Sequence, residues 1–141
     1  MNAKEYLSQA FTLHGLIKAK KSRIEQLRDM RESVAGGLQT GTRVQTSRVS
    51  DPIGEMTAKI LEVEENCQRD ITKLISVQRE IEEVIESVIN PSSRLILYER
   101  YINLKTWEDI AEDNHYSLKW VHVLHKRGLE SAVEIIRYKN L

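Results

Sequence analysis

An apolar residue recurs at seven-residue spacing between residues 53 and 88, and this repeat constrains the fold more than any other feature of the sequence. One row consists of Ile53, Ile60, Cys67, Leu74, Ile81 and Val88, and a second row, three positions later, of Met56, Val63, Asp70, Val77 and Val84. An average spacing of 3.5 residues is the period of a helix that packs lengthwise on another helix. We call these eleven positions the seam; they predict one long helix over residues 52–89.

The ends of this helix are marked in the sequence. Ser50 or Asp51 can cap its first amides, and Pro52 is tolerated at the first helical position because its missing N–H would have no partner there. Asn90-Pro91 ends it. Upstream, apolar residues at helical spacing predict an amphipathic helix over residues 3–34. Gly36-Gly37 is expected to stop that helix, and residues 36–50 read as a flexible loop.

The formal net charge is zero, with 21 basic and 21 acidic residues, but the charge is divided unevenly along the chain. Residues 1–50 hold nine basic and four acidic side chains, a net charge of +5. Residues 51–90 hold four basic and ten acidic ones, a net charge of −6. A basic helix and an acidic helix joined by a loop predict an antiparallel hairpin across the seam. A homodimeric coiled coil through the same seam is the alternative.

Composition restricts the class of protein further. A chain of 141 residues with only 2 prolines and 6 glycines predicts an all-α fold of one domain, or of a small domain with a helical extension. The single cysteine, Cys67, and an opening without a leader-type segment predict a cytoplasmic protein. No apolar run is long enough for a membrane span. Without a phosphate-binding loop, a nucleophile motif or a metal-ligand set, we expect no enzyme activity, metal or cofactor.

The last third, residues 91–141, predicts a second domain after a hairpin domain over residues 1–90. A short helix is expected to end near Asn103, Thr106 can cap a second helix, and Ser117 can cap a third. Two helices joined by a turn of three or four residues, with the small Ala111 at their crossing, form the helix-turn-helix arrangement. His115, His122 and His125 are expected at the surface or on phosphates rather than on a metal.

Residues 100–130, RYINLKTWEDIAEDNHYSLKWVHVLHKRGLE, resemble the C-terminal helix-turn-helix of sigma factors, their region 4. The chain is most similar to phage-encoded, sigma-like late transcription regulators of the ArpU and RinA type, including streptococcal phage proteins. Residues 43–54 also resemble the corresponding loop of those proteins. Gly128 stands where the family pattern prefers Ala, so the third helix is expected to end or bend there.

The resemblance implies a phage or prophage transcription regulator that binds promoter DNA in a bacterial host, with RNA polymerase as a second partner. The third helix would then enter the major groove. The candidate DNA-binding residues are Ser117, Leu118, Lys119, Trp120, His122, Lys126 and Arg127. Residues 117–128 contain no acid, so their cations can approach phosphates unopposed. Trp120 could instead pack in the local core.

A protein-docking role is the alternative function. Three formal positive charges over residues 117–128 allow few phosphate contacts, and an acidic seam helix repels DNA. The chain could therefore be a non-enzymatic adaptor whose helix-turn-helix contacts RNA polymerase or a virion protein. If DNA is the target, we expect binding by a dimer or with the help of polymerase.

Overall fold

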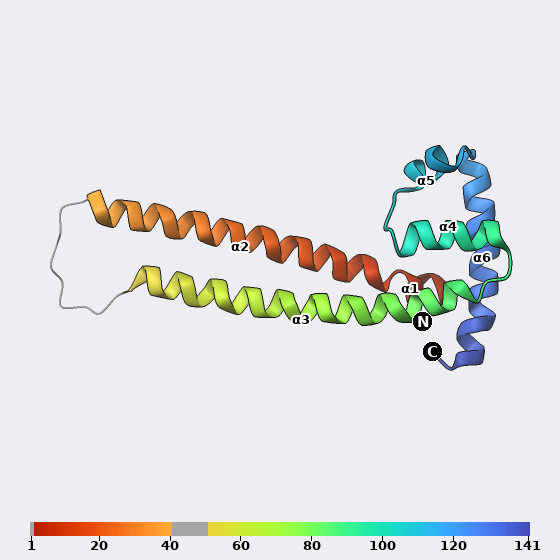
Figure 1. Ribbon diagram of the computed structural model, residues 1–141, viewed down its shortest axis with the longest axis horizontal. Helices are drawn as coiled ribbons and strands as arrows, with labels where there is room; N and C mark the ends of the chain where they lie inside the picture. Colours follow the sequence, from red (N-terminus) through yellow and green to blue (C-terminus); the bar gives the residue numbers. More distant parts are fainter. Residues whose placement is uncertain (1, 41–50) are drawn as a thin grey trace. The chain divides into compact units, whose positions relative to one another are not determined.

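The structure is a computed structural model that describes residues 2–40 and 51–141. Over these ranges it is all-helical (Figure 1). The helices are α1 (Ala3–Leu7), α2 (Gln9–Thr40), α3 (Pro52–Glu86), α4 (Pro91–Tyr101), α5 (Trp107–Asn114) and α6 (Leu118–Lys139). The contacts between residues divide the chain into two compact units, one over residues 15–72 and one formed by residues 1–14 and 73–141. The domain boundary expected at residue 90 stays a prediction.

In the unit over residues 15–72, the first part of α3 runs antiparallel to α2 (Figure 1). Two ion pairs fix their register: Lys20 Nζ lies 2.5 Å from Asp70, and Arg28 lies 2.6 Å from Glu64. Asp70, the polar residue that interrupts the seam, is half-buried and pairs with Lys20. Cys67 is buried as a small hydrophobic residue. The basic helix therefore does pair with the acidic helix inside one chain.

The other unit contains two apolar clusters, of which one is larger. The members of the larger cluster come from α1, the start of α2, the end of α3, α4 and α6, and the most deeply buried include Leu7, Ile81, Val84, Ile85, Val88 and Leu97. A second cluster joins Ile96 of α4 to Ile110 of α5 and to Val121 and Leu124 of α6. Every seam position is buried or half-buried within its own unit, as the heptad repeat predicts.

The helix predicted over residues 3–34 begins at residue 3 as expected, but it is interrupted near its start and extends beyond its expected end. It is interrupted at Ser8, which caps α1 with its backbone N–H on the Lys4 carbonyl, and α2 starts afresh at Gln9. The N-terminal end of α1 is fixed by a capping box in which Asn2 and Glu5 bond each other's backbone amides. At the other end α2 continues through Gly36-Gly37 to Thr40. Neither glycine has a positive φ, so each costs helix propensity without stopping the helix.

The seam helix begins where expected but ends early. Asp51 caps α3 by accepting a hydrogen bond from the Gly54 amide, and Pro52 is the first helical residue. The last helical residue is Glu86 rather than residue 89, because Ser87 and Val88 bond carbonyls three residues back and Asn90 caps α4 instead. Of the predicted loop over residues 36–50, the first five positions are helical, and residues 41–50 lie outside the described residues.

Candidate nucleic-acid interface

Local capping bonds place α5 and α6 as a helix, a short turn and a second helix. Thr106 caps α5 by accepting from the Asp109 amide at 3.1 Å, and Ser117 caps α6 by accepting from the Trp120 amide at 3.1 Å. Between the helices, His115 takes the left-handed conformation with φ 56° and ends α5. Both predicted caps are confirmed.

The inner side of α6 holds this pair of helices together. Val121 is fully buried and Leu124 is 1% exposed, and both pack against Ile110 of α5. Tyr116, in the turn, is half-buried against the same cluster. The position of α6 on α5 is therefore set by apolar contacts on one side of the helix, which leaves its other side to solvent.

All seven predicted contact residues lie on the solvent side. Ser117, Leu118, Lys119, Trp120, His122, Lys126 and Arg127 are all exposed. Trp120 is 40% exposed, so the alternative that it packs in the core is wrong. The Arg127 guanidinium lies 5.4 Å from the centre of the Trp120 ring, within the range of a cation–π contact. His122 in turn lies against the Trp107 ring, with the ring centres 4.9 Å apart.

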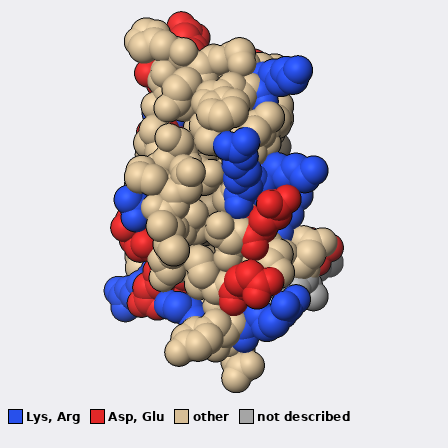
Figure 2. Space-filling view, turned by 90° about the vertical axis from the view of Figure 1, so that its right-hand side faces the viewer, with Lys and Arg blue, Asp and Glu red and all other residues tan. Residues whose placement is uncertain are grey.

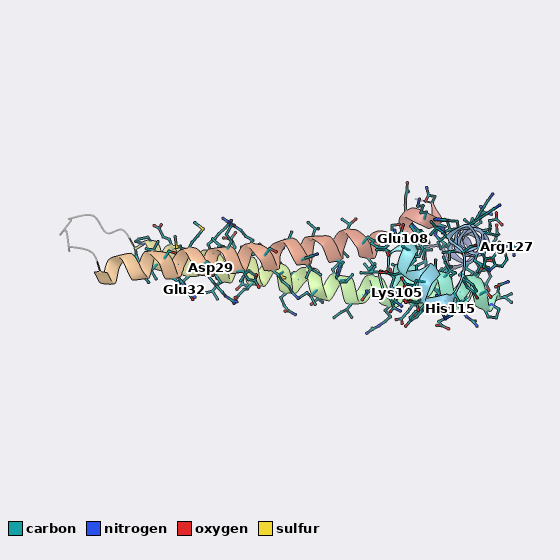
Figure 3. All side chains as sticks on the ribbon, turned by 90° about the horizontal axis from the view of Figure 1, so that it is seen from above. Asp29, Glu32, Lys105, Glu108, His115 and Arg127 are labelled. Carbon is teal, nitrogen blue, oxygen red and sulfur yellow. The ribbon has the colours of Figure 1, made fainter. Side chains whose placement is uncertain are left out.

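Charge is distributed unevenly along the exposed side of α6. Lys119, Lys126 and Arg127 occupy its first half, whereas the second half holds two acids, Glu130 and Glu134, followed by two bases in the last turn, Arg137 and Lys139. Figure 2 faces this helix, and in the middle of the view Lys and Arg side chains lie above Asp and Glu side chains, beside a broad uncharged surface. Figure 3 places Arg127 on the outer side of α6, away from α5. The part of α6 nearest the turn is therefore the part in which exposed cations stand without an acid between them.

Gly128 does not bend α6, contrary to expectation. The helix continues unbroken to Lys139, and Gly128 is buried where α6 crosses α4. A Cβ atom there would lie 2.9 Å from Cδ1 and 3.0 Å from Cγ of Leu97. The glycine is explained by the close approach of the two helices rather than by a helix end.

His125 is buried, although the sequence suggested a surface position. It is 8% exposed, and its Nε2 lies 2.7 Å from the Tyr101 hydroxyl. Burial, helped by the charges of Lys4, His122 and Arg100, lowers the pKa of His125 to about 4. The imidazole is therefore neutral at pH 7, and its Nε2 shares a hydrogen bond with the hydroxyl of Tyr101, whose own pKa burial raises to about 12.

Acid should destabilise the protein through this histidine. The unfolded chain binds a proton near the ordinary pKa of 6.5, whereas the folded chain takes it up only near pH 4. The free energy of unfolding should thus fall as the pH drops from 6.5 to 4, by about 1 to 2 kcal/mol between pH 7 and pH 5. Urea unfolding of the wild type and of His125→Gln at both pH values measures this loss. Equal losses in the two proteins would contradict it.

Two basic residues were not singled out by the sequence: Arg100, in the last turn of α4, and Lys105, in the connection to α5. Lys105 Nζ lies 2.6 Å from Glu99 and 2.9 Å from Asp113, and the hydrogen bonds to these carboxylates raise the pKa of Lys105 to about 12. The Arg100 guanidinium lies between the rings of Phe11 and Trp107, 4.6 and 4.4 Å from their centres. In the sequence, the only sign of this contact is that Arg100 is basic and lies just before the expected end of its helix. Phe11 is too distant in sequence to be recognised as its partner.

Comparison of the chain with protein-family models, curated proteins and solved structures finds no match. No helix in the described part of the chain combines the length and apolarity that crossing a membrane requires. Over the same residues, no three His, Cys, Asp or Glu side chains gather as a metal site would need.

Proposed function

We propose that the protein is a phage or prophage transcription regulator that binds promoter DNA through α5 and α6. The observation that supports this most directly is the division of α6, in which Val121 and Leu124 face the core while every predicted contact residue is exposed. The similarity of residues 100–130 to sigma-factor region 4, and to regulators of the ArpU and RinA type, supports late-gene control as the setting.

The charges suggest how such a contact would form. Lys119, Lys126 and Arg127 would approach phosphates or guanine edges, with no acid between residues 117 and 128 to oppose them. The first turn of a helix in the major groove contacts base edges most directly, so Leu118 and Lys119 would read sequence. Trp120, held by Arg127, offers a flat apolar surface to a sugar or a thymine methyl group.

Three cations per chain limit the affinity. Each phosphate contact contributes about 0.9 to the slope of log K against log salt, so one chain should show a slope of about −3. A dimer, or a complex with RNA polymerase, would add contacts and raise the affinity. We therefore propose that the regulator acts as a dimer or together with polymerase in the cytoplasm of the bacterial host.

The test is binding of the purified protein to fragments of the genome that encodes it, followed by fluorescence anisotropy at several salt concentrations. Binding with a slope near −3 per bound chain, and preference for one fragment over equally long competitors, are the expected results. The absence of any salt-dependent binding would overturn the proposal.

A protein-docking function is the second candidate, favoured by the apolar side chains on the same surface. Leu118 is 43% exposed beside Trp120, and exposed tryptophans often dominate the binding energy of protein interfaces. On this hypothesis Leu118→Ser should abolish capture of RNA polymerase or a virion protein, while DNA retention is absent in the wild type as well.

A further inference from the structure

A pocket of about 290 Å³ lies in the unit formed by residues 1–14 and 73–141, where residues of α1, α2, α4 and α5 come together. Its lining consists of Lys4, Ser8, Phe11, Thr12, Arg100, Tyr101 and Trp107. The side chains are thus two cations, three hydroxyl-bearing groups and three aromatic rings, with Tyr101 counted in both of the last two classes. No carboxylate lines the pocket.

Neither cation of the pocket forms an ion pair with a carboxylate of the described residues. Arg100 is half-buried, donates one hydrogen bond to the Lys105 carbonyl at 2.8 Å, and is otherwise flanked by the two rings. Stacking occupies the faces of a guanidinium and leaves N–H donors at its edge available to an anion. Fully buried cations are almost always paired with a counter-charge, and for this half-buried guanidinium residues 2–40 and 51–141 supply none.

The acids of α5 and of the end of α4 are not among the residues that line the pocket. Glu99 and Asp113 are held by Lys105. In the first turn of α5, Glu108 and Asp109 are exposed and do not line the pocket, and Figure 3 labels Glu108 at this end of the unit. The lining of the pocket therefore carries two cations and no carboxylate.

We propose that this pocket binds a phosphate ester, with Lys4 and the edge of Arg100 on the phosphoryl oxygens and the aromatic rings against the attached organic group. The Ser8 and Thr12 hydroxyls complete the donor set. The volume is at the lower end of the range for small-molecule sites and suits a mononucleotide. The same chemistry is offered by a backbone phosphate of bound DNA, and only this second source rests on the proposed function.

One shared side chain connects the pocket to the exposed side of α6. The Trp107 ring contacts Arg100 of the pocket. The same ring also lies against His122 of α6, with the two ring centres 4.9 Å apart. A phosphate ester that orders Arg100 and Trp107 would also order His122.

The experiment titrates adenosine 5′-monophosphate and inorganic phosphate into the full chain without DNA, by isothermal calorimetry at low salt. Lys4→Gln removes one cation at an exposed position, and Thr12→Phe fills the pocket while leaving both cations in place. Lys18→Gln, a cation on α2 outside the pocket, is the matched control. We expect the monophosphate to bind with a Kd below about 1 mM, about fivefold to tenfold more weakly to Lys4→Gln, and not measurably to Thr12→Phe.

A parallel measurement of DNA binding separates the two sources. If the monophosphate does not bind but Lys4→Gln alone lowers the salt slope by about 1 and Thr12→Phe weakens DNA binding, the occupant is a backbone phosphate. Monophosphate binding without any DNA binding would keep the pocket and remove the proposed function. If Lys4→Gln and Thr12→Phe bind the monophosphate and DNA no differently from the wild type, the pocket proposal is overturned.

Discussion

Reversing the charge of both Lys126 and Arg127 to Glu should weaken DNA binding about 100-fold or more at low salt. The two side chains supply two of the three exposed cations in the first half of α6, so the variant loses two phosphate contacts and gains two repulsive charges. The slope of log K against log salt should become shallower, from about −3 to between about −1 and zero per chain. Fluorescence anisotropy with the preferred genome fragment measures both quantities.

The matched control is the same reversal at Arg137 and Lys139, in the last turn of α6. Both residues are exposed, and Arg137 has only an exposed contact with Glu134 of the same helix. This control changes the net charge equally but lies beyond the basic half of the helix, so it should lower the affinity less than threefold. Equal losses in the two variants, with unchanged helical circular dichroism, would show that net charge rather than this surface governs binding.

Local signals in the sequence predict the helix starts well. Asp51, Thr106 and Ser117 each cap the helix expected from their position, because a capping bond involves residues two or three apart. The heptad repeat likewise predicts which side of α3 is buried, because residues spaced by the helical period lie on the same side of a helix. The assignment of α5 and α6 to DNA stays a prediction, as does the choice between a hairpin alone and an additional dimer.

What the sequence could not predict depends on contacts between distant residues. The burial of His125 follows from its bond to Tyr101, 24 positions earlier. The site around Arg100 needs Phe11, 89 positions earlier, which contacts Arg100 and Tyr101 only in the folded chain. The break at Ser8 could not be predicted because the apolar period continues across it, and the capping box of Asn2 and Glu5 marks only the start of α1.

Gly128 is the residue whose substitution should most affect stability. Leu97, which a Cβ atom at this position would touch at 2.9 to 3.3 Å, is fully buried in the main core cluster and has little room to move. Gly128→Val adds two further methyl groups to this contact, and overpacking of that kind costs about 2 to 3 kcal/mol. Urea unfolding should register this loss as a lower denaturation midpoint.

Two alanine variants isolate the steric cause. Replacing a helical glycine by alanine ordinarily stabilises a protein by up to about 1 kcal/mol, and Gly15→Ala in α2, with no atom within 4 Å of the new Cβ, should show this gain. Gly128→Ala should show none, because crowding against Leu97 offsets the improved propensity. In a Leu97→Ala background the crowding is relieved, so Gly128→Ala should become stabilising there. If Gly128→Ala stabilises the wild type as much as Gly15→Ala does, close packing does not account for the glycine, and its departure from the alanine of the sigma-like pattern needs another explanation.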